Sequence, residues 1–212
     1  MYQSPAFAEE RVDVMHALIR AHAFATLVVC MDGMPDANHL PLLLDPQPAP
    51  YGTLRGHVAR ANPLWRELAD GRQALAIFQG PQTYVTPSWY PSKRETGQVV
   101  PTWNYAVVHA YGVPVVREDR AWLRNLVSQL TDLQETPMAQ PWSIDDAPAE
   151  YIERMLGAIV GIELPISRLQ GKWKVNQNRT AADRAGVVAG LAQSGDAQSL
   201  AMADLVGGKR GV

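Results

Sequence analysis

One segment of the chain, residues 83–105, gathers side chains that could bind a flat ligand. Its aromatic and polar members include Ser88, Trp89, Lys93, Trp103 and Asn104. The segment is too rich in proline for a helix and too aromatic for a solvated linker. Aromatic faces with a few polar groups on a stiff backbone suit a planar ligand or an interface between subunits. The spacing does not choose between these two interpretations.

A second segment, residues 171–179, could bind an anion. Alternate side chains of an extended chain share a face, which predicts one face bearing Lys172, Lys174, Asn176 and Asn178. Two ammonium groups beside amides complement a phosphate. The alternative is a solvated edge strand whose lysines discourage aggregation.

A third candidate is Arg60, which directly precedes a short helix predicted over residues 61–69. Asn62 can cap this helix, and Pro63 fits its first turn. The first amides of a helix attract anions, so Arg60 could hold a phosphate there. The alternative is an arginine on the surface with no ligand.

The sequence contains no recognisable metal or nucleophile motif. His39, His57 and His109 lie in extended stretches without HxxxH, HExxH or CxxC spacing. A GxSxG elbow and a glycine-rich phosphate loop are also missing from the sequence. We therefore predict no metal ion and assign no catalytic residue. The single cysteine, Cys30, lies in an apolar run and is expected to be buried.

The elements that must position these residues are mainly short strands. Strands are predicted at residues 26–31, 37–44, 52–58, 73–80, 102–116 and 159–164, with an extended stretch at 172–178. Helices are predicted at residues 8–22, 61–69, 121–133, 150–156, 180–192 and 199–206. Turns rather than helices join successive strands, so the sheet should be mainly antiparallel. This pattern predicts an α+β protein built on a β-barrel with peripheral helices, with Pro41 at a sheet edge or bulge.

Composition narrows the functional class. The chain has 212 residues, 47% of them hydrophobic, and a formal net charge of -2. That charge argues against a general nucleic-acid binder, which should carry a basic excess. The N-terminus does not have the pattern of a signal peptide, and no apolar run approaches the roughly 20 residues that span a bilayer. We expect a cytoplasmic protein that is not inserted in a membrane.

Five motifs in order resemble one known family. They are NHLP from Asn38, GHVARANPLW, TYVTPSWYPSK, VPTWNYAVVHAYG and GKWKVNQNR. Together they resemble the PaiB-type FMN-binding negative transcriptional regulators of the flavin-binding split-barrel superfamily, from residue 1 to about residue 190. Asn176 departs from the family pattern, which more often has serine there.

The resemblance implies a fold and an assembly. The fold would be a six-stranded antiparallel split β-barrel with peripheral helices. Residues 1–170 would form the FMN-binding domain, and residues 171–212 would be an extended segment and helices packed on the same domain. The protein would be a homodimer with FMN sites at the subunit interface, so Trp89 and Trp103 should lie close to the subunit boundary.

The resemblance also implies a set of cofactor-binding residues. Those beside the ring edge would be Asn38, His39 and Leu40. Those near the phosphate would be His57, Ala59, Arg60 and Asn62. Those lining the pocket would be Ser88, Trp89, Lys93, Thr102, Trp103 and Asn104. Those completing it would be Lys172, Gln177 and Arg179.

The function implied by the resemblance is negative regulation of transcription by an FMN-binding protein. The sequence has no clear helix-turn-helix, and its positive residues after position 180 are Arg184, Lys209 and Arg210. DNA contact would therefore be direct or through a partner protein. One alternative is a flavin-dependent oxidoreductase of the reductase or oxidase type. A lower-ranked alternative is a haem-binding split barrel.

Overall fold

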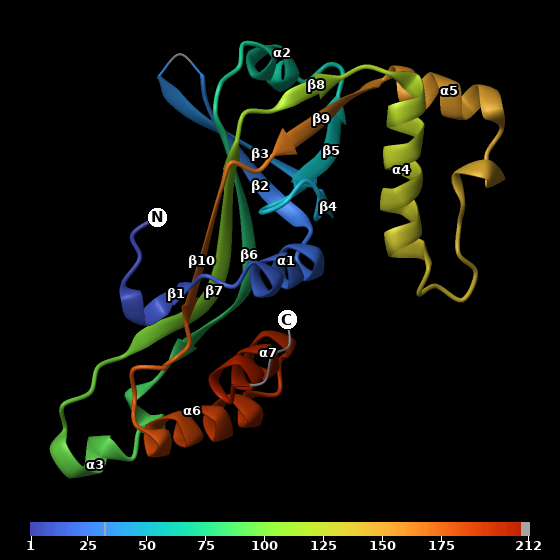
Figure 1. Ribbon diagram of the computed structural model, residues 1–212. Coiled ribbons are helices and arrows are strands. Elements are labelled where there is room, and N and C mark those ends of the chain that lie inside the picture. Colours follow the sequence, from blue (N-terminus) through green and yellow to red (C-terminus); the bar gives the residue numbers. More distant parts are fainter. Residues whose placement is uncertain (32, 209–212) are drawn as a thin grey trace. The chain divides into compact units, whose positions relative to one another are not determined.

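The computed structural model of the protein describes residues 1–31 and 33–208 (Figure 1). Its contacts divide the chain into two compact units. The first comprises Met1–His22, Ile77–His109 and the chain from Leu169 onward; the second comprises Ala23–Ala76 and Ala110–Arg168. Lys209 and Arg210 lie outside the described residues. The predicted division at residues 170 and 171 stays a prediction.

The strands form two sheets. In the larger sheet the order is β1 (Ala8–Glu9), β10 (Arg168–Lys174), β7 (Thr102–Gly112), β6 (Ala74–Val85), β2 (Phe24–Met31) and β3 (Met34–Pro41). In the smaller sheet the order is β4 (Leu43–Asp45), β5 (Thr53–Ala59), β9 (Ile159–Pro165) and β8 (Val115–Arg117). The pairs β1–β10, β2–β3, β4–β5, β5–β9 and β8–β9 are all antiparallel, as predicted, although only β2–β3 and β4–β5 join strands that follow each other closely in the chain.

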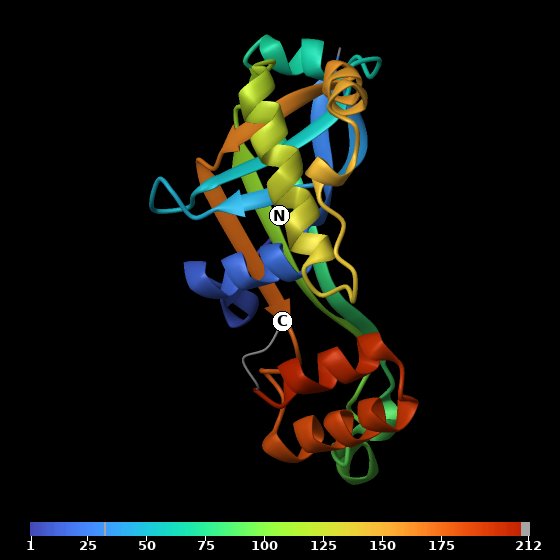
Figure 2. The same cartoon turned by 90° about the vertical axis from the view of Figure 1, so that its right-hand side faces the viewer.

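The helices of the first unit are α1 (Val12–Ala21), α3 (Ser92–Thr96), α6 (Ala181–Ser194) and α7 (Ala197–Val206), with the short turns η1 (Pro5–Phe7) and η2 (Pro87–Trp89). Helix α1 buries Leu18 and Met15, and a Cβ on Gly80 or Gly171 would lie 2.8 Å from one of these two side chains. Glycine at these strand positions therefore lets α1 approach the sheet closely. Helices α6 and α7 pack against each other as a pair (Figure 2).

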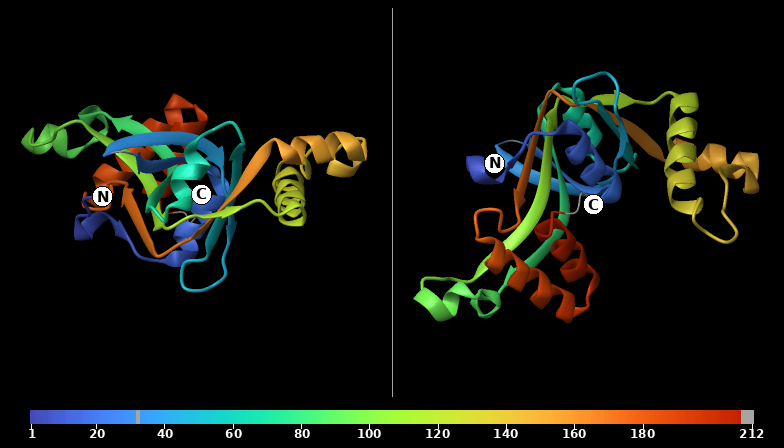
Figure 3. Two further views of the ribbon diagram at one scale, coloured as in Figure 1. Left: turned by 90° about the horizontal axis from the view of Figure 1, so that it is seen from above. Right: turned by 60° about the horizontal axis from the view of Figure 1, so that its bottom comes forward.

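The helices of the second unit are α2 (Leu64–Ala69), α4 (Arg120–Glu135) and α5 (Ala149–Gly157), with the short turn η3 (Ile144–Asp146). Helix α4 begins where the Asp119 carboxylate accepts from the Trp122 amide at 2.8 Å. Helices α4 and α5 lie side by side (Figure 3). They and η3 bury a common apolar cluster of Leu123, Ile144, Ile152 and Leu156. Each such side chain contributes about 1.5–3 kcal/mol by leaving water.

The sequence predicts most of the helices and strands, but it predicts their first and last residues less well. Ala8 and Glu9 pair with β10, so the first helix begins only at Val12. The predicted strand 37–44 is two strands, β3 and β4, and the predicted strand 102–116 is β7 and β8. Pro41 ends β3, which is a terminal strand of its sheet, so the expected edge position is confirmed.

The prediction that Cys30 is buried is wrong. The thiol is exposed because the core side of β2 is formed by Ala25, Leu27 and Val29. Side chains alternate along a strand, so Cys30 falls on the opposite face. Among helices in the described part of the chain, none combines the length and apolarity needed to cross a membrane.

Candidate functional site

The cofactor-binding residues predicted from the sequence fall into two groups, one in each unit. The second unit holds Asn38, His39, Leu40, His57, Ala59, Arg60 and Asn62. The first unit holds Ser88, Trp89, Lys93, Thr102, Trp103, Asn104, Lys172, Gln177 and Arg179. Within each group several of these side chains contact one another or share neighbours.

In the second unit, a chain of amides connects β3 to the start of α2. Asn62 Nδ2 donates to Asn38 Oδ1 at 2.7 Å, and Asn38 Nδ2 donates to Asp36 Oδ2 at 2.8 Å. Asn62 Oδ1 also accepts from the backbone amide of Leu64 at 2.9 Å, although the N-cap of α2 is Pro63 and not Asn62 as predicted. Both amide orientations are thereby set by their partners. Asn38 and Asn62 are brought together.

His39 presents its ring on the exposed face of the same strand. Its Nδ1 lies 3.2 Å from Thr26 Oγ1, and its ring stacks on Phe24 with 6.3 Å between centroids. Leu40, the next residue, is buried on the other face of β3. His39 therefore offers a positioned, solvent-accessible imidazole, whereas the Leu40 side chain belongs to the core.

Arg60 is fixed by the second unit itself. Its Nε donates to Gly157 O at 2.9 Å and its Nη2 to Ile159 O at 3.1 Å. Its Nη1 donates to the Glu118 carboxylate at 2.6 Å. Two guanidinium nitrogens thus hold the chain where α5 ends and β9 begins, and the third pairs with Glu118 between β8 and α4. Ala59, which precedes it, is exposed.

His57 has a buried ring nitrogen. Its Nδ1 has no hydrogen-bond partner among the described residues. Burial lowers the pKa of the imidazole, which favours the neutral ring. Because β5 and β9 place His57 opposite Gly161, no side chain faces it directly across the strand pair.

In the first unit, Asn104 lies at one end of a buried polar network. Asn104 Nδ2 donates to Asn176 Oδ1, and Asn176 Nδ2 donates to the Tyr90 hydroxyl at 2.9 Å. The Arg179 guanidinium lies 5.0 Å from the centre of the Tyr90 ring, within cation–π range. Asn104 Oδ1 is buried without a partner among the described residues. The network brings Asn104 and Arg179 near the same tyrosine.

The prediction that Asn176 shares the lysine face is wrong. Strand β10 ends at Lys174, and Asn176 adopts a left-handed φ of 61° that reverses the chain. The turn directs its amide into the core, where it is 4% exposed. Gln177 serves the same turn, since its Oε1 accepts from the Val175 amide at 2.8 Å and its Nε2 donates to Trp173 O.

Three lysines of the first unit donate to neutral oxygens. Lys93 Nζ is 3.3 Å from Ser88 Oγ, and Lys172 Nζ is 3.0 Å from Tyr2 O. Lys174 Nζ donates to Thr102 Oγ1 and, at 3.0 Å, to Trp103 O. Neutral partners do not compensate the positive charge of an ammonium group, so these lysines can still attract an anion.

The two tryptophans of the aromatic segment have different environments. Trp89 packs on α6, where a Cβ on Gly190 would lie 2.4 Å from its ring. The same segment is held to α6 by Ser92 Oγ, which donates to Asp183 Oδ2 at 2.9 Å. Trp103 is 56% exposed and meets Tyr84 edge to face at 6.1 Å between centroids. Only Trp103 presents most of its ring to solvent.

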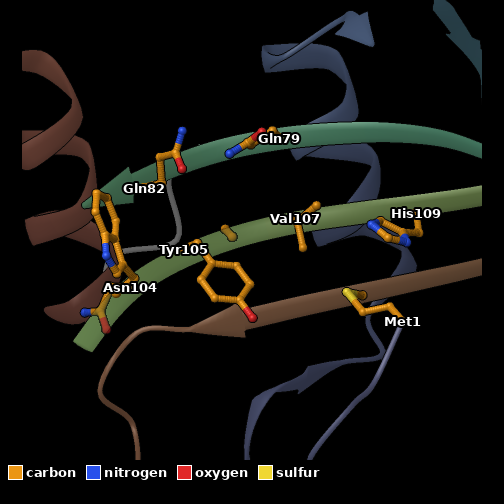
Figure 4. Close-up of a pocket in the computed structure, with 9 residues that line it drawn as sticks. Met1, Gln79, Gln82, Asn104, Tyr105, Val107 and His109 are labelled. Carbon is orange, nitrogen blue, oxygen red and sulfur yellow. The ribbon is translucent and has the colours of Figure 1, made fainter. Parts of the chain in front are cut away.

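A groove of about 390 Å³ lies on the half-exposed face of β6 and β7 (Figure 4). Its side chains from β6 are Gln79 and Gln82, and those from β7 are Trp103, Tyr105, Val107 and His109. This volume is within the range of small-molecule sites, about 300–1,000 Å³. Burial lowers the pKa of His109, which favours a neutral imidazole at one end of the groove.

Of the residues that line this groove, Trp103 and Asn104 were predicted from the sequence and the others were not. The period of two along Trp103, Tyr105, Val107 and His109 was the available signal, since alternate residues of a strand share a face. No such signal pointed to Gln79 and Gln82, which are three residues apart. Within residues 1–31 and 33–208 no group of three or more histidine, cysteine or acidic side chains could hold a metal ion.

Comparisons with known proteins place these features in context. Residues 1–168 match the protein-family model described as "Putative FMN-binding domain". The chain is 32% identical over 241 residues to an uncharacterised protein of Emericella nidulans, covering 97% of this chain and 96% of that protein. It is 31% identical over 206 residues to protease synthase and sporulation protein PAI 2 of Bacillus subtilis, covering 97% and 96%.

Solved structures show the same fold at low sequence identity. The FAD and haem binding protein from Mycobacterium smegmatis superposes with a TM-score of 0.56 at 18% identity, covering 78% of this chain and 72% of that chain. This likeness concerns the fold alone. It confirms the predicted class, a mainly antiparallel α+β protein of the split-barrel type.

Proposed function

Because the chain belongs to the family defined by this FMN-binding domain, as its motifs predicted, we propose that it binds FMN and acts as a negative regulator of transcription. The observation that carries the proposal is the family match over residues 1–168. The regulatory part is supported by 31% identity to a relative whose name refers to protease synthesis and sporulation. The proposal includes a cytoplasmic homodimer.

The charged residues of the first unit fit the phosphate of FMN. A phosphate needs cations and hydrogen-bond donors. Lys93, Lys172 and Lys174 have neutral oxygen partners in the described structure, so an incoming dianion would not have to displace a carboxylate from them. Arg60 is a weaker candidate, because Glu118 already neutralises it.

The apolar and amide groups of the same unit fit the flavin ring. Trp103 and Tyr105 provide aromatic surface beside a groove of suitable volume. Asn104, the residue between them, is 1% exposed with its side chain on the other face of β7, so its role in cofactor binding stays a prediction. His39 belongs to the second unit, and contact of its exposed imidazole with the cofactor stays a prediction. Bound FMN would supply electron transfer, which these residues could tune by hydrogen bonding.

Titration of the purified protein with FMN, followed by flavin absorbance and fluorescence, tests the cofactor. We expect saturable binding of FMN and weaker binding of riboflavin, which has the same ring but no phosphate. Saturable binding of haem without flavin binding would instead favour the haem alternative. Absence of FMN binding in a folded sample would contradict the proposal.

A gel shift with DNA from upstream of its own gene tests the regulatory part. The assay should be run with and without FMN at about 50 mM and about 200 mM salt, because electrostatic binding weakens steeply over this range. Specific binding, direct or in the presence of a cellular extract, would support regulation. FMN-dependent turnover of a nicotinamide donor without any DNA effect would favour an oxidoreductase instead.

A further inference from the structure

We propose that Gln79 and Gln82 recognise the imide edge of the flavin ring in the groove on β6 and β7. This inference rests on the proposed binding of FMN, and it assigns the ring to residues outside the set predicted from the sequence. The two glutamines lie on β6, and Tyr105, Val107 and His109 lie on the neighbouring β7 (Figure 4).

The two glutamines share a face because the alternation of β6 changes phase between them. Residues three apart on a regular strand point to opposite faces. In β6 the consecutive residues Gly80 and Pro81 are both buried, whereas Gln79 and Gln82 on either side are exposed. The burial pattern thus shifts by one residue between the glutamines, which is the change that a β-bulge produces. Without this shift, Gln82 would face the core.

The phase shift is built into the surrounding packing. A Cβ on Gly80 would lie 2.8 Å from Leu18 Cδ1 and 3.2 Å from Ala106 O, so the backbone at Gly80 lies directly against α1 and β7. Pro81 has no amide hydrogen to donate to a neighbouring strand. The backbone N–H of Gln82, the next donor along the chain, donates to Gln198 Oε1 at 3.2 Å. The outward direction of Gln82 is therefore a fixed property of the strand.

The chemistry of the groove matches an imide on an aromatic ring. A glutamine amide offers both a donor and an acceptor, so two of them can pair with a C=O, N–H, C=O edge. The pyrimidine end of the flavin ring carries that edge. Trp103 and Tyr105 add aromatic surface next to the amides, and the Lys172 ammonium lies 5.5 Å from the Tyr105 ring. The groove thus combines edge recognition, apolar surface and a nearby positive charge.

The test compares riboflavin with its N3-methyl derivative, which lacks the imide hydrogen. We expect wild-type protein to bind riboflavin more tightly than the derivative by about tenfold, since a site built for a donor rejects an analogue without it. Gln79→Leu and Gln82→Leu should each weaken riboflavin binding by about threefold to tenfold. They should weaken binding of the methyl derivative much less, so that discrimination is lost.

Gln134→Leu, at an exposed position on α4, is the matched control and should retain discrimination. Thermal midpoints identify any variant that fails to fold, and Gln79→Met and Gln82→Met then replace the leucine variants. If wild type binds FMN but the groove variants keep full affinity and discrimination, the inference is overturned and the proposed function stands. If wild type binds no flavin, the proposed function fails as well.

Discussion

Arg60 illustrates how a side chain singled out for ligand binding can already serve the fold. Spacing placed it before a helix, where a phosphate could bind. In the structure its guanidinium reaches Gly157 O, Ile159 O and Glu118 instead. A role in phosphate binding stays a prediction, and it would have to coexist with these bonds.

The structural role of Arg60 is testable without any ligand. Arg60→Ala leaves two carbonyls without their charged donor, so we expect the free energy of unfolding to fall by about 2 kcal/mol. Denaturant unfolding of the flavin-free protein measures this loss. Arg66→Ala, which removes an exposed guanidinium 4.6 Å from the Trp65 ring, should cost less than about 1 kcal/mol. Equal losses in both variants would contradict the assigned role.

Because of His57, we expect the free energy of unfolding to decrease as the pH falls below the ordinary pKa of histidine. Burial lowers its pKa in the folded protein, whereas the unfolded chain has the ordinary value of about 6.5. Below that pH the unfolded state binds a proton that the folded state does not, so stability falls until the pH reaches the lowered folded value. Urea midpoints at about pH 7.5 and about pH 5.5 measure the loss.

His57→Asn should reduce this loss without abolishing it, because burial also lowers the pKa of His22 and His109. An unchanged loss in the variant would show that His57 is not responsible for it.

At the level of elements, the contact between η2 and α6 decides how the aromatic segment is held. Gly190→Ala improves helix propensity by about 1 kcal/mol, but its Cβ would lie 2.4 Å from the Trp89 ring. Overpacking costs about 1–3 kcal/mol, so we expect net destabilisation. In a Trp89→Ala background the same change should stabilise by about 1 kcal/mol. A double-mutant cycle of unfolding free energies measures the difference, and additive effects would refute the packing argument.

The sequence predicted most elements because hydrophobic periodicity is local. It did not predict the turn at Asn176. The buried side-chain amide of Asn176 in this left-handed turn is compensated by hydrogen bonds to Asn104 and Tyr90, which are distant in sequence, so no local pattern indicates it. It also missed the glutamine pair. The period of two fails at Gly80 and Pro81, which are both buried, and the backbone at Gly80 lies close to Leu18, a residue distant in sequence.

At the scale of the whole molecule, the motifs in the sequence predicted the family and the fold class correctly. They could not show which candidate residues keep free hydrogen-bonding capacity. That depends on partners such as Glu118 for Arg60 and Asp36 for Asn38, which no motif contains. The sequence thus predicted which segments hold candidate binding residues. The structure shows which of their side chains already form hydrogen bonds within the protein and which could bind a ligand.

The proposed homodimer is tested by sedimentation equilibrium. We expect twice the 23.3 kDa mass of the chain. Trp103 is 56% exposed and is predicted to lie close to the subunit boundary, so Trp103→Glu should shift the protein toward the monomer. Leu200→Glu, at another exposed apolar side chain, is the control and should leave the dimer intact. If the wild type is a monomer, the proposed homodimer is wrong. If Trp103→Glu leaves the dimer intact, Trp103 does not lie close to the subunit boundary.

The exposed position of Trp103 has an optical consequence. Its indole lines the groove on β6 and β7, where the flavin ring is proposed to bind. Tryptophan emission overlaps the near-ultraviolet absorption of flavins, so a bound ring would accept excitation energy from this indole. The residue thus provides a built-in reporter of occupancy: its share of the emission from the six tryptophans of the chain would fall as the cofactor binds, without any attached label.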